Sequence, residues 1–205
     1  MKTILWDFDG VILDSMDVRD YGFYQIFKKF NSEDIEFLIQ YHRKNGGLSR
    51  YVKIKYFFEE ILLQKISNEE INNYANNFSL IMRQELVNSS KLIAQSINFI
   101  KSNYKNYNFH IVSGSDENEL KYLCDKLKIA IYFISINGSP TSKNELVNNL
   151  MIKYDYDKNE TCLIGDSIND YDAANKNNIK FYAFNNQNLK VKNFDYINSF
   201  KNFNF

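Results

Sequence analysis

The feature that most constrains the fold is the alternation of short apolar runs with helix-like stretches. The apolar runs are rich in β-branched and aromatic residues, which is typical of buried strands. We expect strands at Thr3–Trp6, Phe109–Val112, Ile131–Ile134, Thr161–Ile164 and Ile179–Phe184. From about residue 91 onward they alternate with helix-like stretches near residues 91–104, 116–128, 143–154 and 168–177. This alternation predicts an α/β fold, in which helices cover a doubly wound, Rossmann-like parallel sheet.

The first two expected strands are about a hundred residues apart, whereas a crossover between parallel strands needs only about a dozen. Helical periodicity runs through this gap, in residues 17–31, 33–44, 50–65 and 68–88. We therefore predict a helical cap domain at residues 15–88. It would be inserted into an α/β catalytic core made of residues 1–14 and 89–205.

Composition excludes several partners and compartments. The chain has 25 Lys and Arg and 25 Asp and Glu, so no net field attracts nucleic acid or an anionic membrane, and we expect neither as a partner. Cys124 and Cys162 are far apart in apolar stretches, as expected of reduced core thiols. The short apolar run before Asp7 leaves no room for a signal peptide, so we expect a cytoplasmic protein. We also expect either a monomer or a weak homodimer.

Polar residues follow the expected strands where ligands bind to parallel sheets, beyond the carboxyl ends. Asp7 and Asp9 follow the first strand, Ser113 the second and Asp166 the fourth, while the turn after the third leads to Lys143. If the backbone stays extended, the Asp7 and Asp9 carboxylates point to the same side. Two such charges favour a bound cation, and Mg²⁺ prefers carboxylate oxygens. A pair of this kind alone is more typical of loop carboxylates or helix caps.

The segment after the second strand favours an anion. Ser113 and Gly114 precede an expected helix, whose free N–H groups and dipole attract negative charge. Ser113 could simply cap that helix, but Asp116 and Glu119 already form a pair like a capping box. Lys143, at the start of another expected helix, opposes the dipole there and so suits an active-site cation, although a lysine taken alone is more often a solvated surface residue.

The segment Gly165-Asp166-Ser167-Ile168-Asn169-Asp170 combines a close turn with two carboxylates. Asp166 is placed as a further metal ligand. Asp170 has two interpretations, because Ser167 followed by Asp170 also resembles a capping box, and both roles are compatible.

In their order these motifs resemble those of the haloacid dehalogenase-like hydrolases. They are Asp7-Phe8-Asp9-Gly10-Val11, Ser113, Lys143 after Gly138-Ser139-Pro140, and the segment from Gly165 to Asp170. The resemblance spans residue 7 to about residue 185, and the helical insertion resembles the first cap type of the branch that contains phosphoglycolate phosphatase and β-phosphoglucomutase. It implies an Mg²⁺-dependent phosphatase that acts on a small phosphorylated metabolite, a sugar phosphate or a phosphoglycolate-like compound.

The resemblance also implies roles for the residues. Asp7 is the expected nucleophile, which forms an aspartyl-phosphate, and Asp9 is the expected acid and base. Ser113, Gly114 and Lys143 would hold the phosphate. Asp7, the Asp9 carbonyl and Asp166 would bind Mg²⁺, and Asp170 would orient Lys143 or a metal-bound water. Crowding by carboxylates would raise the pKa of Asp9, while the metal and Lys143 would lower it, and the sequence leaves the balance open.

Two other activities are alternatives. Phosphosugar mutases of this fold carry a histidine ten residues beyond the second aspartate, where this chain has Arg19. Arginine cannot serve as a base, so hydrolysis is favoured; Arg19 either binds a second anionic group of the substrate or lies on the surface. A receiver-like phosphoacceptor regulator would use similar residues, but it gives no reason for the large insertion.

The expected cap contains a glycine-rich turn, Asn45-Gly46-Gly47-Leu48-Ser49-Arg50. It resembles the loop by which capped relatives reach the substrate, which places Gly47 and Arg50 as specificity residues. Alternatively, the glycines simply join two helices.

Overall fold

The structure, a computed structural model, describes residues 1–192 and 194–205. Its strands form one parallel sheet in the order β3-β2-β1-β4-β5-β6. The strands are β1 Thr3–Trp6, β2 Asn108–Asp116, β3 Ser135–Ser139, β4 Thr161–Gly165, β5 Lys180–Phe184 and β6 Tyr196–Ile197. The strand order changes direction between β1 and β4, where sheets of this type bind ligands. The predicted doubly wound α/β fold is confirmed.

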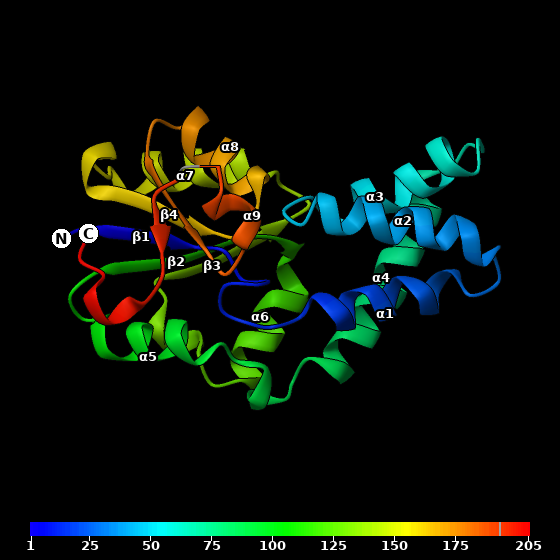
Figure 1. The fold of residues 1–205 in the computed structure, drawn as a ribbon. Helices are drawn as coiled ribbons and strands as arrows, with labels where there is room; N and C mark the ends of the chain where they lie inside the picture. The colour runs from blue at the N-terminus through cyan, green and yellow to red at the C-terminus, as the bar shows by residue number, and fades with distance from the viewer. Residues whose placement is uncertain (193) are drawn as a thin grey trace.

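Helices cover both faces of the sheet (Figure 1). One face carries α5 (Ala94–Asn103) and α6 (Glu117–Lys126), and the other carries α7 (Lys143–Tyr154) and α8 (Ile168–Lys176); the short α9 (Gln187–Lys190) follows β5. Alternate residues of β1 enter different cores: Ile4 and Trp6 belong to the larger one, and Leu5 to the smaller. Burial on both faces explains why β1 is apolar at every position after Thr3.

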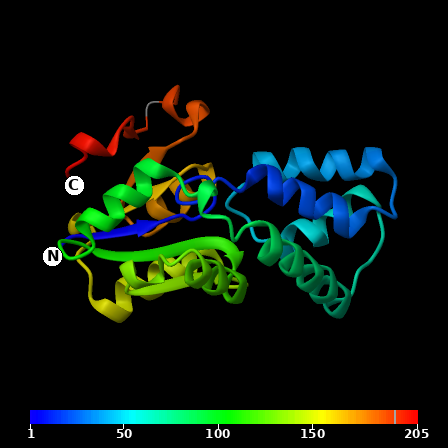
Figure 2. The same ribbon diagram turned by 90° about the horizontal axis from the view of Figure 1, so that it is seen from below.

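The chain between β1 and β2 forms a separate group of helices, which we call the helical insertion (Met16–Glu85). It contains α1 (Met16–Phe27), α2 (Ser32–Lys44), α3 (Arg50–Tyr56), a π-helical turn (Phe57–Ile61) and α4 (Asn68–Glu85). These helices lie together beyond the carboxyl ends of the strands (Figures 1 and 2). Aromatic side chains fill their centre, where the Phe27 and Phe57 rings stack 4.2 Å apart.

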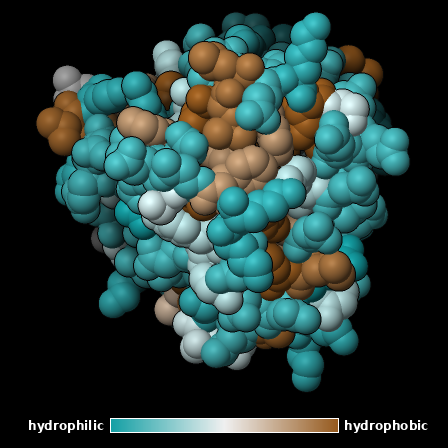
Figure 3. Space-filling model, turned by 90° about the vertical axis from the view of Figure 1, so that its right-hand side faces the viewer, coloured by the Kyte–Doolittle hydropathy of each residue, from teal (hydrophilic) through white to brown (hydrophobic). Residues whose placement is uncertain are grey.

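The outer end of the helical insertion faces the viewer in Figure 3 and is mostly hydrophilic, with apolar side chains gathered near its upper edge. Exposed apolar residues of the insertion include Phe37, Leu63 and Leu80. Among the helices of the described residues, none combines the length and the apolar character that a membrane span requires.

Some predicted elements are wrong. The apolar run Ile131–Ile134 is not a strand: a 3₁₀ turn covers Ala130–Tyr132, and β3 begins at Ser135. The helix predicted at residues 50–65 changes to π-helical geometry at Phe57, and α5 begins at Ala94 after a 3₁₀ turn instead of near residue 91. The short β6 at the sheet edge was not predicted.

Candidate active site

Asp7 lies at the centre of the sheet's carboxyl edge. It directly follows β1, and its backbone N–H donates to the Ile164 carbonyl at 2.9 Å, which fixes it beside the end of β4. The Asp7 carboxylate is buried and accepts a hydrogen bond from Lys143 Nζ at 2.8 Å. The same ammonium also donates to Asp170. Lys143, on α7, thus links Asp7, which follows β1, to Asp170 on α8.

Three carboxylates meet at this edge. One oxygen each of Asp7, Asp166 and Asp170 lies within 4.8 Å of the others. Lys143 offsets one of their charges, so the four side chains together carry two negative charges when all are ionised. A divalent cation would balance these charges, and an all-oxygen donor set is the type that Mg²⁺ prefers. The residues present therefore fit such an ion.

Burial and mutual repulsion raise the pKa of two of these carboxyls. The pKa of Asp7 is raised to about 7, by burial first and then by the charge of Asp170, against the opposing charge of Lys143. Burial, followed by the charges of Asp7 and Asp170, also raises the pKa of Asp166 well above its ordinary value. Both carboxyls are therefore harder to ionise in the protein alone, because they are buried and because they repel each other.

The turn after Asp7 passes very close to Asp166. Gly10 has a φ of +76°, and a Cβ on it would lie 2.0 Å from Asp166 Oδ2. Glycine is therefore required at this position, both for the left-handed backbone and for the close approach.

Lys143 is the first residue of α7, as predicted, and Ser142 caps that helix together with Glu145. The pKa of Lys143 is raised although its burial acts to lower it, because the charges of Asp170 and Asp7 outweigh the desolvation. Asp170 combines both proposed contacts: one oxygen accepts from Lys143, and the other accepts from Ser167 Oγ at 2.6 Å in the capping box of α8. Asp170 therefore bonds Lys143 and also completes the capping box at the start of α8.

The Asp9 carboxylate faces away from the acidic cluster. Its oxygens accept hydrogen bonds from Arg19 Nε and Ser115 Oγ, both at 2.6 Å, and from Ser15 Oγ. Burial acts to raise the pKa of Asp9, but the charge of Arg19 and these hydrogen bonds outweigh it, so the pKa is lowered. The sequence left this balance open, and neither Ser15 nor Ser115 was foreseen as a partner.

Ser113 and Gly114 lie within β2, which continues to Asp116, so the prediction that they follow the strand is wrong. Ser113 is buried, and its hydroxyl accepts the Ser115 N–H at 3.1 Å. A Cβ on Gly114 would lie 2.4 Å from the Gly47 carbonyl oxygen. The glycine-rich loop of the helical insertion is therefore in contact with the expected phosphate-binding segment.

Gly47 is confined from the other side as well. A Cβ on Gly47 would lie 2.7 Å from Asn169 Cβ and 2.9 Å from Ser167 Oγ, at the start of α8. The glycines thus do more than join two helices, since Gly47 fits between β2 and the start of α8.

Arg19 and Arg50 share one buried carboxylate. Glu119 is fully buried on α6, and it accepts from Arg19 Nη1 at 3.2 Å and from Arg50 Nη1 at 2.6 Å. The interpretation of Arg19 as a surface residue is wrong, because only 5% of it is exposed. The predicted capping box of Asp116 and Glu119 is also wrong, because the Glu119 carboxylate bonds the two arginines instead of the Asp116 N–H. Only the Asp116 side chain caps α6, by accepting the Glu119 N–H.

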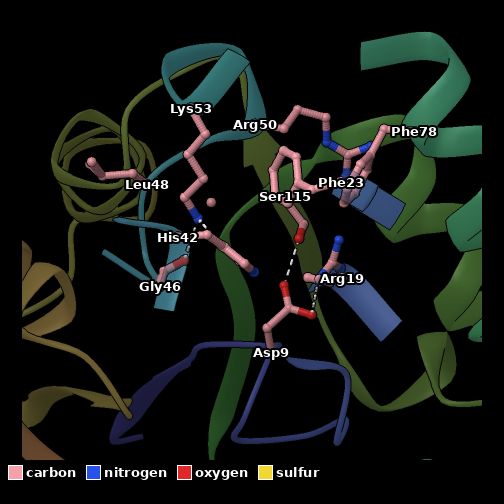
Figure 4. Close-up of a pocket in the computed structure, with 11 residues that line it drawn as sticks. Asp9, Arg19, Phe23, His42, Gly46, Leu48, Arg50, Lys53, Phe78 and Ser115 are labelled. Carbon is pink, nitrogen blue, oxygen red and sulfur yellow. Dashed lines mark hydrogen bonds and ion pairs between the residues drawn. The ribbon is translucent and has the colours of Figure 1, made fainter. Parts of the chain in front are cut away.

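A small pocket adjoins Asp9 and contains two further polar residues, His42 and Lys53 (Figure 4). Lys53 Nζ lies 2.8 Å from His42 Nδ1, and both residues are buried. Neither Lys53 nor His42 was predicted as a site residue from the sequence. Helical spacing could have identified Lys53: Lys53 and Ile54 come three and four residues after Arg50, so all three lie on one face of α3. Glu119 gave no such signal, because its partners are 69 and 100 residues away.

Comparison with known proteins agrees with this arrangement. Residues 4–184 match the family model described as haloacid dehalogenase-like hydrolase. No curated protein matches the chain. Solved structures with similar folds include β-phosphoglucomutase from Clostridium difficile, with a TM-score of 0.78 and 18% identity over 100% of this chain and 94% of that one.

Two more solved structures have the same fold. One is described as a predicted phosphatase from Clostridium acetobutylicum, with a TM-score of 0.74, 17% identity and coverage of 96% of this chain and 92% of that one. The other is CbbY from Rhodobacter sphaeroides in complex with xylulose 1,5-bisphosphate, with a TM-score of 0.78, 13% identity and coverage of 98% and 96%. The receiver-like alternative is wrong, because receiver-type proteins have the strand order 2-1-3-4-5 whereas this sheet has the order 3-2-1-4-5-6. Sheet order, motif order and the match over most of the sequence agree: the chain belongs to the haloacid dehalogenase-like hydrolases.

Proposed function

We propose that this protein is a Mg²⁺-dependent phosphatase that hydrolyses a small phosphorylated metabolite, a sugar phosphate or a phosphoglycolate-like compound, through an aspartyl-phosphate on Asp7. We further propose that residues 15–88 act as a cap over a catalytic core of residues 1–14 and 89–205. The similar folds of a described phosphatase and of a protein bound to a sugar bisphosphate support this substrate class.

The observation that carries the proposal is the convergence of Asp7, Asp166, Asp170 and Lys143 at the switch point of the sheet, with Asp9 close by in sequence but turned to the pocket. A nucleophile for phosphoryl transfer must meet an anionic substrate without repulsion. Lys143 supplies one positive charge at Asp7, and Mg²⁺ held by Asp7, Asp166 and the Asp9 carbonyl would supply the remaining neutralisation of charge when bound.

The reaction requires two proton transfers. Asp7 attacks phosphorus, the phosphorus–oxygen bond to the alcohol breaks, and Asp9 in its acid form donates a proton to the leaving oxygen. Asp9 then removes a proton from a water molecule that attacks the phosphorus, and the bond between phosphorus and Asp7 breaks to release inorganic phosphate. Ser113, the Gly114 N–H and Lys143 hold the phosphate oxygens and stabilise the charge of the transition state. Before substrate binds, the hydrogen bonds from Arg19, Ser15 and Ser115 favour the base form of Asp9.

Arg19 supports hydrolysis over phosphosugar mutase chemistry. Its guanidinium is buried and bonded to Asp9 and Glu119, and it cannot take a proton at physiological pH. A mutase would have to use another base at this position.

The test is turnover of p-nitrophenyl phosphate with Mg²⁺, its loss with EDTA, and its return when Mg²⁺ is added. Asp7→Asn should abolish turnover while circular dichroism shows an unchanged fold. Near-normal Mg²⁺-dependent activity in that variant would exclude Asp7 as the nucleophile. Conversion of a sugar 1-phosphate into its 6-phosphate without phosphate release would establish the mutase instead.

A further inference from the structure

The pocket beside Asp9 contains cationic side chains to which the proposed reaction assigns no contact with the substrate. Arg19, Arg50 and Lys53 line it together with His42, and each of the four is no more than 5% exposed. Phe23, Leu48 and Phe78 form apolar walls around them. Because charged side chains are rarely buried without partners, such a group of cations at a substrate site indicates an anionic ligand.

Several buried N–H groups of this pocket have no acceptor. Within the described part of the chain, Nη2 of Arg19 and Nη2 of Arg50 are buried and make no hydrogen bond. Lys53 Nζ bonds His42 Nδ1 and, at 3.3 Å, the Gly46 carbonyl, which leaves one of its three donors. Unsatisfied buried donors are costly, and an anion would satisfy them.

The charge of the pocket limits the ligand. With Lys53 protonated, and with Asp9 ionised as it is before substrate binds, the three cations Arg19, Arg50 and Lys53 face two carboxylates, Asp9 and Glu119. One positive charge is then uncompensated. A group with one negative charge would balance the pocket, whereas a phosphate dianion would reverse its sign.

The size of the pocket gives the same limit. The space open to the centres of water molecules is about 20 Å³, which is room for one or two waters. This volume favours the smaller of the two groups, a carboxylate, over a phosphate ester.

His42 sets the direction of the Lys53 ammonium. Burial, and then the charge of Lys53, lowers the pKa of His42 well below its ordinary value, so its Nδ1 is a neutral acceptor. The opposite nitrogen, Nε2, faces Asp20 Oδ1 at 3.7 Å. A hydrogen on Nε2 is therefore favoured, which leaves the Nδ1 lone pair for Lys53.

We propose that the pocket binds a carboxylate of the substrate, with Lys53 as a specificity residue and His42 as its positioning residue. The substrate class is then a short phosphorylated carboxylic acid, whose phosphate reaches Asp7 while its carboxylate lies among Arg19, Arg50 and Lys53. This inference rests on the proposed function and selects among its substrates.

The experiment compares three esters with the same two-carbon skeleton: 2-phosphoglycolate, 2-hydroxyethyl phosphate and 1,2-ethanediol bisphosphate. They place a carboxylate, a neutral hydroxyl or a phosphate at the second position. Wild type should prefer 2-phosphoglycolate to each of the other two by about 10- to 100-fold in kcat/KM, the factor expected for a hydrogen bond to a charged group. Equal values, or a preference for the bisphosphate, would overturn the proposal.

Variants identify the residues responsible. Lys53→Met, which keeps the length of the side chain, should reduce the preference for 2-phosphoglycolate over 2-hydroxyethyl phosphate about tenfold or more, mainly through KM. Lys55→Met, at an exposed position of the same helix, is the matched control and should leave the preference unchanged. A loss of preference in both variants, or in neither, contradicts the role of Lys53. If Lys53→Met fails to fold, Lys53→Gln replaces it.

His42 is tested by a conservative pair. His42→Asn keeps an acceptor near the position of Nδ1 and should retain most of the preference for the carboxylate, whereas His42→Phe has no acceptor and should lose it. Equal preferences in the two variants would mean that His42 has only a packing role.

Failure of the proposed function can be distinguished from failure of this inference. If wild type hydrolyses p-nitrophenyl phosphate but does not discriminate among the three esters, only the inference fails. If wild type hydrolyses no ester, the proposed function fails, and calorimetric titration of the unreacted esters still measures whether 2-phosphoglycolate binds more tightly than 2-hydroxyethyl phosphate.

Discussion

Replacement of Glu119 by glutamine should destabilise the protein far more than the same replacement at an exposed glutamate. Glu119 is fully buried, and its two oxygens accept from Arg50 Nη1 at 2.6 Å and Arg19 Nη1 at 3.2 Å. Glutamine keeps the shape and one acceptor oxygen, but it directs an amide N–H₂ at the other arginine. Two buried guanidinium groups then share a single neutral acceptor.

The magnitude follows from the burial of all three side chains. Hydrogen bonds to charged groups contribute about 1.5–3 kcal/mol each, and removal of one partner from a buried ion pair costs about 3–5 kcal/mol. Arg19 keeps Asp9, and Arg50 keeps Ser79 Oγ and the Phe78 ring, so the lower end of this range applies. We expect the free energy of unfolding to decrease by about 3 kcal/mol.

The assay is equilibrium unfolding in urea, followed by circular dichroism and by the fluorescence of Trp6. Glu59→Gln is the control, since it makes the same chemical change in an exposed pair with Lys55 and should cost less than about 1 kcal/mol. The difference between the variants should persist in 1 M NaCl, because buried pairs are little screened. A loss for Glu119→Gln within about 0.5 kcal/mol of the control would refute this reasoning.

Three further predictions concern the site. Lys143→Met removes the cation that bonds Asp7 and Asp170, so kcat for p-nitrophenyl phosphate should decrease by about 10²–10³-fold, and a decrease below tenfold would contradict its role. Gly47→Ala places a Cβ 2.7 Å from Asn169 Cβ, so the glycine-rich loop of the helical insertion must shift. The free energy of unfolding in urea should decrease by about 1–3 kcal/mol, and KM should increase. An unchanged KM would argue against a role of this loop in substrate binding. Burial, and then the charge of Arg19, lowers the pKa of Lys53 to about 7. The ammonium is therefore present below that pH and lost above it, so the preference for 2-phosphoglycolate over 2-hydroxyethyl phosphate should decrease as pH rises from about 6 to about 9; a constant ratio over this range would contradict it.

The central strands of the sheet can be predicted from the sequence because they are buried on both faces and almost entirely apolar. β1 and β4 are covered on both faces, so Thr3–Trp6 and Thr161–Ile164 stand out from their surroundings. The edge strand β3 (Ser135–Ser139) does not, because Ile136 is its only large apolar residue and its first three residues are partly exposed. The nearby apolar run contains a 3₁₀ turn instead of a strand. Local hydrophobicity therefore predicts central strands better than edge strands.

The same distinction applies to the site. Asp7, Asp166 and Lys143 were identified because each follows a strand or begins a helix at the carboxyl edge, a position that the chain itself encodes. Glu119 depends on contacts between the core and two arginines of the helical insertion, Arg19 and Arg50. No local pattern encodes those contacts, because they depend on how two groups of helices pack.

The position of β1 in the centre of the sheet has a consequence for synthesis. β1 is made first, yet its neighbours on either side are β2, which begins at Asn108, and β4, which begins at Thr161. A nascent chain whose β4 has not yet left the ribosome exposes one edge of the apolar strand β1, and unpaired apolar edges associate with other chains. A pause at that stage should therefore lead to aggregation, whereas a pause after β4 has left the ribosome should be harmless.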